Sequence, residues 1–178
     1  MTRCRKTPEI RGLSFWLGII PRMLEITIRR AWPGEAAALQ ELLHRSKAHW
    51  GYDADFMAVA RRVLTVTEGQ IVTDWVFVAE TGGILAGFAS LADRRDHAWL
   101  EDLFIEPEFI GQGVGRDLWN HVCAHARQHG FALMRWESDP NARLFYEHLG
   151  ARVIGSTPSH IVPGLMIPLM EIALQNPS

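Results

Sequence analysis

The sequence predicts a single mixed α/β domain, on three observations. Its 178 residues suit one compact core. Stretches that alternate apolar and polar residues, as half-buried strands do, give way to stretches with apolar residues at helical spacing, and then return. No internal repeat, linker or low-complexity block interrupts the expected order β-α-α-β-β-β-α-β-α-β-β.

Residues 1–22 are expected to be an extension outside the fold, with residues 23–178 forming the domain. Basic residues precede a short apolar run at 13–20, as in a signal peptide, but no small-residue cleavage site follows. The run is also far shorter than the ~20 residues that span a bilayer. A start codon assigned too far upstream would produce such an extension, and Met23 would then open the domain.

The first predicted elements are a strand and two helices. Alternating residues predict a strand at 24–30, and apolar residues at helical spacing predict a helix at 35–44. The segment 46–56, SKAHWGYDADF, then breaks the helical pattern. Asp53 or Asp55 is expected to cap a second helix, because a short carboxylate can accept the free N–H groups of a first turn.

Strands dominate the middle of the chain. Runs at 75–80 and 84–91 are joined by Gly82-Gly83, a hairpin turn signal. A charged turn follows, and a third strand is expected at 98–105. These neighbours are expected to pair in antiparallel fashion, because their connections are so short.

Helices and strands alternate toward the C-terminus. A helix is expected from about Val114 to the left-handed cap Gly130, followed by a strand at 131–137. Asp139-Pro140 is a suitable cap and first-turn pair for the next helix. The last strands are expected at 152–156 and 165–174.

Charge and cysteine content exclude several functional classes. The formal net charge of −2 gives no general attraction to nucleic acid, which normally requires a basic face. Neither Cys4 nor Cys123 belongs to a metal-ligand spacing or a disulfide framework. The sequence therefore predicts a cytoplasmic protein with no metal, no nucleic-acid partner and no membrane association.

A glycine-rich turn between a strand and a helix is the strongest local signal. It comprises Gly111, Gln112, Gly113, Val114, Gly115 and Arg116. Glycine lets the backbone approach a ligand closely, and the N–H groups of a helix's first turn can bind an anion. The spacing fits neither the phosphate loop of nucleoside-triphosphatases nor the dinucleotide fingerprint. Taken alone, the turn could equally be a plain connection.

A second motif downstream gives the turn a context. The pattern Asn-x-x-x-Phe-Tyr-x-x-x-Gly falls on Asn141, Phe145, Tyr146 and Gly150. Together with the loop signature [R/Q]-x-x-G-x-[G/A] at 110–115, it resembles the Gcn5-related N-acetyltransferase (GNAT) superfamily. The resemblance covers roughly residues 24–174.

The resemblance implies a fold and a cofactor. The fold is a twisted, mostly antiparallel sheet of six or seven strands, flanked by about four helices and splayed between the fourth and fifth strands. The cofactor is acetyl-CoA, acting as co-substrate. Its pantetheine arm would pair with the backbone of Leu103, Phe104 and Ile105, and Asn141 would hydrogen-bond the same arm.

The pyrophosphate of the cofactor is expected to bind at the glycine turn. Ile110 stands where the family usually places Arg or Gln. Binding should therefore rest on backbone N–H groups from Gln112 to Arg116. The N–H near Leu103 would face the thioester carbonyl and stabilise its developing negative charge.

The chemistry requires a base and an acid. An alkyl amine has a pKa near ~10 and must lose a proton before it attacks a thioester. Glu101 is the expected base, directly or through water, with Asp102 as the alternative. Strand alternation allows only one of them to face the cleft unless a bulge intervenes. Tyr146 is the expected acid, with Phe145 facing the core and Tyr146 displaced by ~100° around the helix.

The acceptor is expected to lie against the segment 46–56. Trp50 and Tyr52 could form an aromatic wall, and Asp102 is a further candidate substrate contact. Asp53 or Asp55 could hold a cation or simply cap the second helix. The predicted function is acetyl transfer to a small-molecule amine, by a monomer or a homodimer. The alternatives are a non-catalytic acyl-CoA-binding module of the same fold and a protein or peptide N-acetyltransferase.

Overall fold

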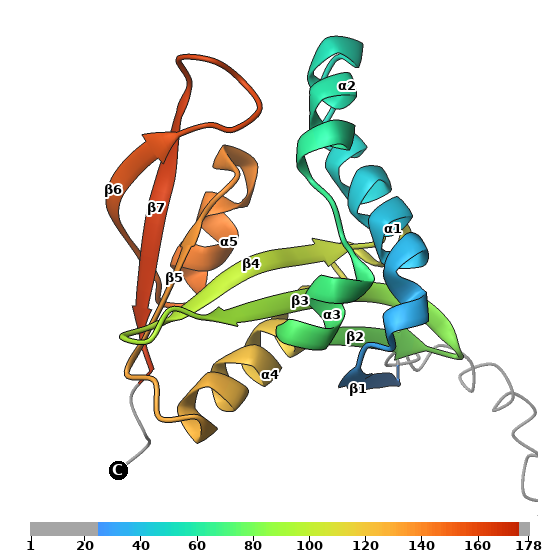
Figure 1. The fold of residues 1–178 in the computed structure, drawn as a ribbon, viewed down its shortest axis with the longest axis vertical. Coiled ribbons are helices and arrows are strands. Elements are labelled where there is room, and N and C mark those ends of the chain that lie inside the picture. The colour runs from blue at the N-terminus through green and yellow to red at the C-terminus, as the bar shows by residue number, and fades with distance from the viewer. Residues whose placement is uncertain (1–24, 175–178) are drawn as a thin grey trace, which may run out of the picture.

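The computed structural model describes residues 25–174, and these form one layered α/β unit around a seven-stranded sheet. The strand order across the sheet is β1-β2-β3-β4-β5-β7-β6 (Figure 1). The strands are β1 (Ile26–Arg30), β2 (Trp75–Thr81), β3 (Ile84–Asp93), β4 (Ala98–Ile105), β5 (Leu133–Glu137), β6 (Arg152–Pro158) and β7 (Met166–Ala173). Every neighbouring pair is antiparallel except β4 and β5, which run parallel. The predicted fold class is confirmed.

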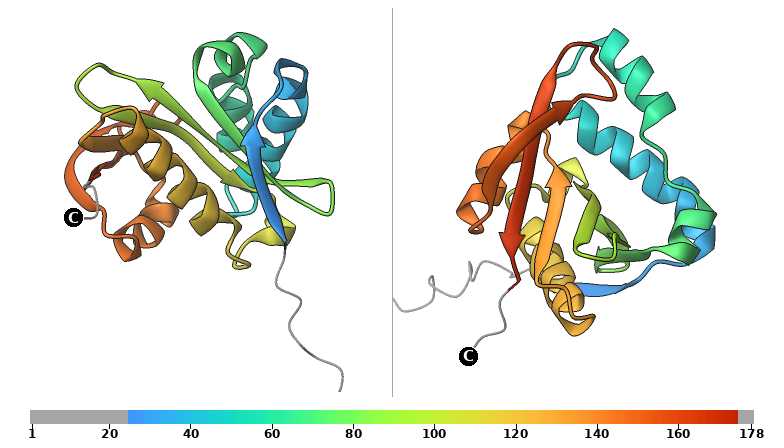
Figure 2. Two further views of the ribbon diagram at one scale, coloured as in Figure 1. Left: turned by 90° about the horizontal axis from the view of Figure 1, so that it is seen from below. Right: turned by 60° about the vertical axis from the view of Figure 1, so that its left-hand side comes forward.

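Helices cover both faces of the sheet. They are α1 (Ala36–Ala48), α2 (Ala54–Val63), α3 (Glu68–Thr73), α4 (Val114–Gln128) and α5 (Arg143–His148). Figures 1 and 2 show α4 on one face of the β2–β4 part and α1 with α3 on the other. Alternation along β2 supplies both cores, because Val76 and Val78 pack toward α1 whereas Phe77 and Ala79 pack toward α4.

The sheet opens between β4 and β5. Their pairing is limited to Ala98 with Met134 and Trp99 with Arg135, after which the strands diverge. The rest of β4, through Ile105, stays paired only with β3. The splay predicted between the fourth and fifth strands is therefore present.

A β-bulge lies in β4 at the start of this divergence. Ser90 and Leu91 of β3 are consecutive, but their partners are Asp102 and Leu100, so Glu101 is the extra residue. A bulge breaks the strict alternation of side chains and bends its strand.

The structure adds one helix to those predicted. The six-residue α3 was missed because it has only one buried residue, Ile71, and thus no apolar repeat to detect. Its N-cap is Thr67, whose side chain accepts from the Gln70 N–H. The predicted extension at 1–22 lies outside the described residues. Within residues 25–174, no helix is long and apolar enough to cross a membrane.

Candidate active site

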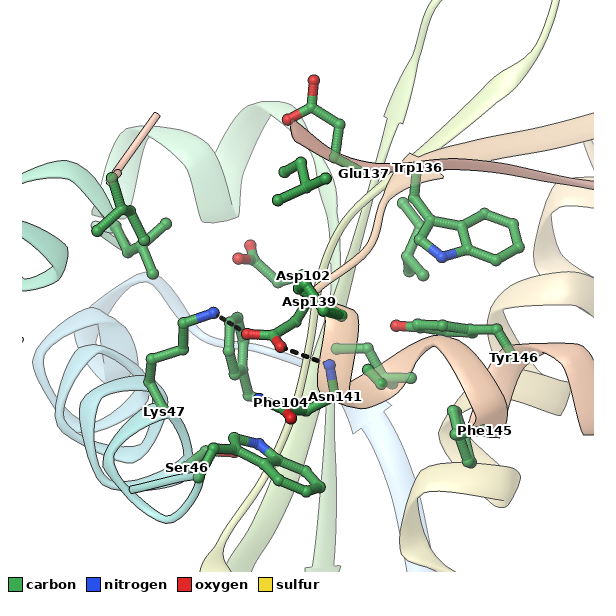
Figure 3. A pocket seen from close by; sticks show the side chains of 18 of the residues that line it. Ser46, Lys47, Asp102, Phe104, Trp136, Glu137, Asp139, Asn141, Phe145 and Tyr146 are labelled. Atoms are coloured by element: carbon green, nitrogen blue, oxygen red, sulfur yellow. Dashed lines mark hydrogen bonds and ion pairs between the residues drawn. The ribbon is translucent and has the colours of Figure 1, made fainter. Parts of the chain in front are cut away.

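The diverging strands open into a cavity of about 1690 Å³ (Figure 3). Its wall is shared by β4, the glycine turn, the segment from Trp136 into α5, the α1–α2 region and the β6–β7 loop. The predicted site residues that line it are Trp50, Tyr52, Asp53, Glu101, Asp102, Leu103, Phe104, Ile105, Gly111, Gly113, Gly115, Arg116, Asn141 and Tyr146. Two segments 87 residues apart, at Tyr52 and Asp139, thereby meet in one site.

The free edge of β4 carries backbone groups suited to an extended ligand. The Glu106 N–H donates to the Ala86 carbonyl of β3. Because hydrogen-bonding direction alternates along an antiparallel strand, the backbone groups of Leu103 and Ile105 point away from β3, toward the gap. An extended chain lying in the gap could pair with them as an added strand.

The glycine turn has the backbone conformation expected of an anion site. Gly111 and Gly113 have φ angles of 80° and 94°, a left-handed region that favours glycine. Gly113 is the N-cap of the 15-residue α4, whose first intrahelical bond is Asp117 N–H to the Gly113 carbonyl. Among the described residues, no acceptor bonds the N–H groups of 113–116, which are left for a ligand.

Only some side chains of the glycine turn line the cavity. Val114 is fully buried, and the Gln112 side chain bonds back to the Glu108 carbonyl; neither lines the cavity. Ile110 does line it and presents an apolar surface there, whereas Arg116 is exposed and cationic. Any contact of Gln112 or Val114 with a ligand in the cavity would therefore be made by the backbone and not by the side chain.

The bulge brings both predicted carboxylates to the cavity. Glu101 accepts from Arg94 of the β3–β4 hairpin. Asp102 accepts from Ser90 Oγ at 2.5 Å and from Gln70 Nε2 at 3.2 Å. Burial raises the pKa of Asp102 to about 6, even though the hydrogen bonds from Ser90 and Gln70 lower it.

Tyr146, and not Phe145, is the buried aromatic residue of α5. Tyr146 is 6% exposed and packs on Trp119 and Trp136 at centroid distances of 5.4 and 4.8 Å. Phe145 is 36% exposed and lines the cavity beside Gly115. The predicted orientation of this pair was wrong, because α5 packs its motif tyrosine against two tryptophans that no local periodicity reveals.

The Tyr146 hydroxyl still reaches the cavity. Figure 3 shows the phenol oxygen directed toward the open part of the pocket. Burial raises the pKa of Tyr146, followed in effect by the charges of Asp139 and Asp102, so the hydroxyl keeps its proton at neutral pH.

A polar cluster faces this tyrosine from the acceptor side. Tyr52 stacks on Phe56 with centroids 3.8 Å apart, and its hydroxyl donates to Asp139 at 2.8 Å. Lys47 forms an ion pair with the same carboxylate, and Asn141 Nδ2 donates to the Tyr52 oxygen at 3.0 Å. Lys47 and Asp139 were not predicted as site residues, because only the folded chain brings them together.

Trp50 and Asp53 complete the acceptor segment. Trp50 is 45% exposed at the cavity rim. The Asp53 carboxylate accepts from the Phe56 N–H at 2.8 Å, so it caps α2 while lining the cavity. The β6–β7 loop, including His160 and Val162, forms the opposite rim and carried no recognisable sequence signal.

Comparison with known proteins identifies the family of this chain. The model of the Acetyltransferase (GNAT) family matches residues 60–151, more than half of the 178 residues. The chain belongs to the GNAT family. It is therefore an acyltransferase of the N-acetyltransferase type.

Relatives and solved structures agree with this assignment. The chain is similar to the "5-NmdU N-acetyltransferase" of Pseudomonas phage PaMx11, with 28% identity over 134 residues, covering 74% of this chain and 91% of the relative. It also resembles the PaiA N-acetyltransferase of Thermoplasma acidophilum in complex with coenzyme A, with a TM-score of 0.72 and 20% identity, covering 84% of this chain and 99% of that one. Salmonella typhimurium YncA with acetyl-CoA gives a TM-score of 0.62 and 24% identity over 86% of this chain and 96% of that one. At these identities, the two structures support the fold.

Among residues 25–174, no group of three or more His, Cys, Asp or Glu side chains could hold a metal ion.

Proposed function

We propose that the protein transfers an acetyl group from acetyl-CoA to the amine of a small molecule by direct attack. The observation that carries the proposal is the meeting of three features in one cavity. These are the free edge of β4, the unbonded N–H groups of the glycine turn, and the carboxylate Glu101 and the phenol Tyr146, which line the same cavity. They would bind the pantetheine arm, bind the pyrophosphate, and transfer the protons, respectively.

The cofactor would lie along the gap between β4 and β5. Its pantetheine arm would pair with Leu103 and Ile105, and its pyrophosphate would accept from the N–H groups of 113–116. The cationic Arg116 lies beside this position. The Leu103 N–H would donate to the thioester oxygen as negative charge develops there. The complexes of structural neighbours with coenzyme A and with acetyl-CoA support acetyl-CoA as the ligand.

Glu101 would act as the base and Tyr146 as the acid. Glu101, directly or through water, would take the proton that the ammonium loses. The amine nitrogen then attacks the thioester carbon and releases its second proton to solvent, and the carbon–sulfur bond breaks as the carbonyl re-forms. The departing thiolate takes the Tyr146 proton, and the phenolate recovers one from solvent. The products are an N-acetyl amide and CoA thiol.

The acceptor side of the cavity favours a cation. Carboxylates there outnumber cations, with Asp53, Asp55, Glu101, Asp102, Glu137 and Asp139 against Lys47, Arg94 and Arg116 in the whole cavity. Among residues 25–174, Asp102 accepts hydrogen bonds only from neutral partners, whereas Glu101 and Asp139 are each paired with a cation, so Asp102 is suited to attract a substrate ammonium. The exposed Trp50 could cover an apolar portion of the acceptor.

A small acceptor is favoured over a long peptide because the cavity is bordered on both sides. The α1–α2 segment with Trp50 and the β6–β7 loop with His160 and Val162 both line it. In Figure 1, α2 and this loop face each other across the opening of the sheet.

The decisive experiment incubates the full chain with acetyl-CoA and a panel of amines while free thiol is followed. The panel holds alkyl amines, polyamines, 5-NmdU and short peptides with free N-termini. Turnover of a small amine with Glu101→Gln inactive would support the proposal. If only peptides release thiol, the small-molecule assignment is wrong.

A further inference from the structure

Four polar residues from distant parts of the chain form one connected cluster across the cavity. Lys47 comes from α1, Tyr52 from the α1–α2 segment, and Asp139 and Asn141 from the start of the α5 region. Asp139 is the centre, since it accepts from Lys47, from the Tyr52 hydroxyl and from the Asn141 backbone N–H at 2.9 Å. Figure 3 shows Lys47, Asp139 and Asn141 in sequence from the α1 side toward Tyr146.

The Lys47–Asp139 ion pair at the centre of the cluster is shielded from water, whereas Asn141 is exposed to the cavity. The side chains of Lys47 and Asp139 are only 12% and 16% exposed. The Lys47 ammonium also lies 5.2 Å from the centroid of the Tyr52 ring and 5.6 Å from that of Phe56. Polar interactions in such surroundings are strong, and an unpaired group there is costly.

The charges of the cluster give its hydrogen bonds a fixed direction. Burial alone would raise the pKa of Asp139, but the Lys47 charge and the bonds from Lys47, Asn141 and Tyr52 lower it overall, so this group is a carboxylate. Burial and the bond to Asp139 raise the pKa of Tyr52, so its hydroxyl is protonated. Its single proton goes to Asp139, and the Tyr52 oxygen can then only accept from a neighbour.

The Asn141 amide is thereby oriented. Its nitrogen must face the Tyr52 oxygen, because turning the amide over would place two oxygens without a proton between them. The amide oxygen is left as an acceptor, and no donor among residues 25–174 bonds it.

We infer that the Lys47–Asp139–Tyr52 chain is a positioning device that aims the Asn141 carbonyl oxygen at an amide N–H of the acyl-CoA arm. The inference rests on the proposed function, which places the arm in this cavity, and on the contact between Asn141 and the arm that the resemblance to GNAT enzymes implies. Its consequence is specific: Tyr52 lies on the acceptor segment, yet its hydroxyl sets the affinity for the acyl donor. The Tyr52 ring keeps its place on Phe56 and can still border the acceptor.

The coupling is reciprocal. If the arm stabilises the oriented amide, then bound acetyl-CoA also stabilises the contact between the α1–α2 segment and Asn141. The donor would then help to hold the acceptor side of the cavity in place before the acceptor binds.

Tyr52→Phe tests the inference, because it removes the hydroxyl and keeps the ring. Affinity for acetyl-CoA is measured by calorimetry, and the KM of the acceptor by thiol release. We expect acetyl-CoA to bind about five- to tenfold more weakly and the acceptor KM to change less than twofold. In an Asn141→Ala background the same substitution should have no further effect on acetyl-CoA binding.

Charge variants supply a second measurement. Lys47→Gln should weaken acetyl-CoA binding severalfold, whereas Lys47→Arg should retain most of it. The matched control is Arg143→Gln, which removes a cation from an exposed ion pair with Glu147 on α5 and should leave acetyl-CoA affinity unchanged. Thermal unfolding of each variant identifies losses that come from instability.

The outcomes separate the inference from the proposed function. If Asn141→Ala leaves acetyl-CoA affinity unchanged, the proposed contact of Asn141 with the arm is wrong. If Asn141→Ala weakens binding but Tyr52→Phe does not, the positioning chain alone is wrong. An increase in acceptor KM with unchanged acetyl-CoA affinity in Tyr52→Phe would instead make the hydroxyl an acceptor contact and overturn the inference.

Discussion

The two halves of the cavity are built from different materials. The cofactor half consists mainly of backbone: the free edge of β4 at Leu103 and Ile105, and the N–H groups of the glycine turn, with Asn141 as the side chain proposed to contact the arm. The acceptor half consists of side chains, such as Asp102 held by Ser90 and Gln70. A backbone site depends on conformation, whereas a side-chain site depends on chemical identity. Substitutions in the acceptor half should therefore change kcat or the acceptor KM, whereas backbone changes in the cofactor half should change the affinity for acetyl-CoA.

The largest effect is expected from Glu101→Gln in the acceptor half. Removing a general base should lower kcat/KM by about 100-fold or more, because the ammonium then has no proton acceptor in place. Affinity for acetyl-CoA should not change, because the proposed cofactor contacts are the backbone of β4 and of the glycine turn and the side chain of Asn141, and do not include Glu101. Thiol release and calorimetry on the same preparation measure both quantities.

Asp102→Asn is the matched variant for this experiment, since the β4 bulge brings both carboxylates to the cavity. It should raise the acceptor KM more than it lowers kcat. A 100-fold loss of kcat in Asp102→Asn beside a small loss in Glu101→Gln would transfer the base role to Asp102.

Tyr146→Phe should lower kcat by about tenfold or more. The ring packs on Trp119 and Trp136 and is kept, while the proton donor for the thiolate is lost. Acetyl-CoA should bind as before, because the arm and pyrophosphate contacts lie elsewhere. Unchanged turnover would remove the acid role and leave Tyr146 a core residue.

The same division explains how much the sequence could predict. The cofactor half is contiguous from Leu103 to Arg116, and its glycines have a local signature, so its elements were predicted to within a few residues. The acceptor half unites Lys47 with Asp139, which are 92 residues apart. Such contacts arise only from tertiary packing.

Two further features depended on packing. The β4 bulge, left open by strand alternation, follows from the pairing of Ser90 and Leu91 with Asp102 and Leu100. The burial of Tyr146 in place of Phe145 follows from two tryptophans on other elements. Neither the bulge nor the buried residue can be predicted from the local sequence, because both depend on contacts with other elements.

Gly113→Ala should weaken the binding of acetyl-CoA by about fivefold to tenfold. Alanine at φ 94° is strained by about 1–2 kcal/mol, and the turn can relieve this only by moving its N–H groups. An added Cβ meets nothing within 4 Å, so the effect is conformational. The dissociation constant of acetyl-CoA should rise, while the acceptor KM should stay within twofold.

Gly83→Ala is the control for backbone strain. Gly83 has a φ of 79° and equally free space around it, but it lies in the β2–β3 hairpin outside the cavity. It should cost similar stability and leave acetyl-CoA affinity unchanged. Equal losses of affinity in both variants would mean that general destabilisation, and not the turn, is responsible.

The smallest expected effect is a gain in stability from Asp102→Asn. Because folding raises the pKa of Asp102 from 3.8 to about 6, the folded protein binds more protons than the unfolded chain between these values. The ionised carboxyl therefore costs stability above about pH 6, and this cost disappears as the pH falls toward 4. Asp102→Asn should be more stable by on the order of 1–2 kcal/mol at pH 8 and by much less at pH 4.

Denaturant unfolding at both pH values measures the difference, with Glu41→Gln on the exposed face of α1 as the control. A gain that is equal at pH 4 and pH 8 would show that the carboxyl is not strained by its burial. A gain confined to high pH would show that the acceptor half gives up stability to keep a charge available for a cationic substrate.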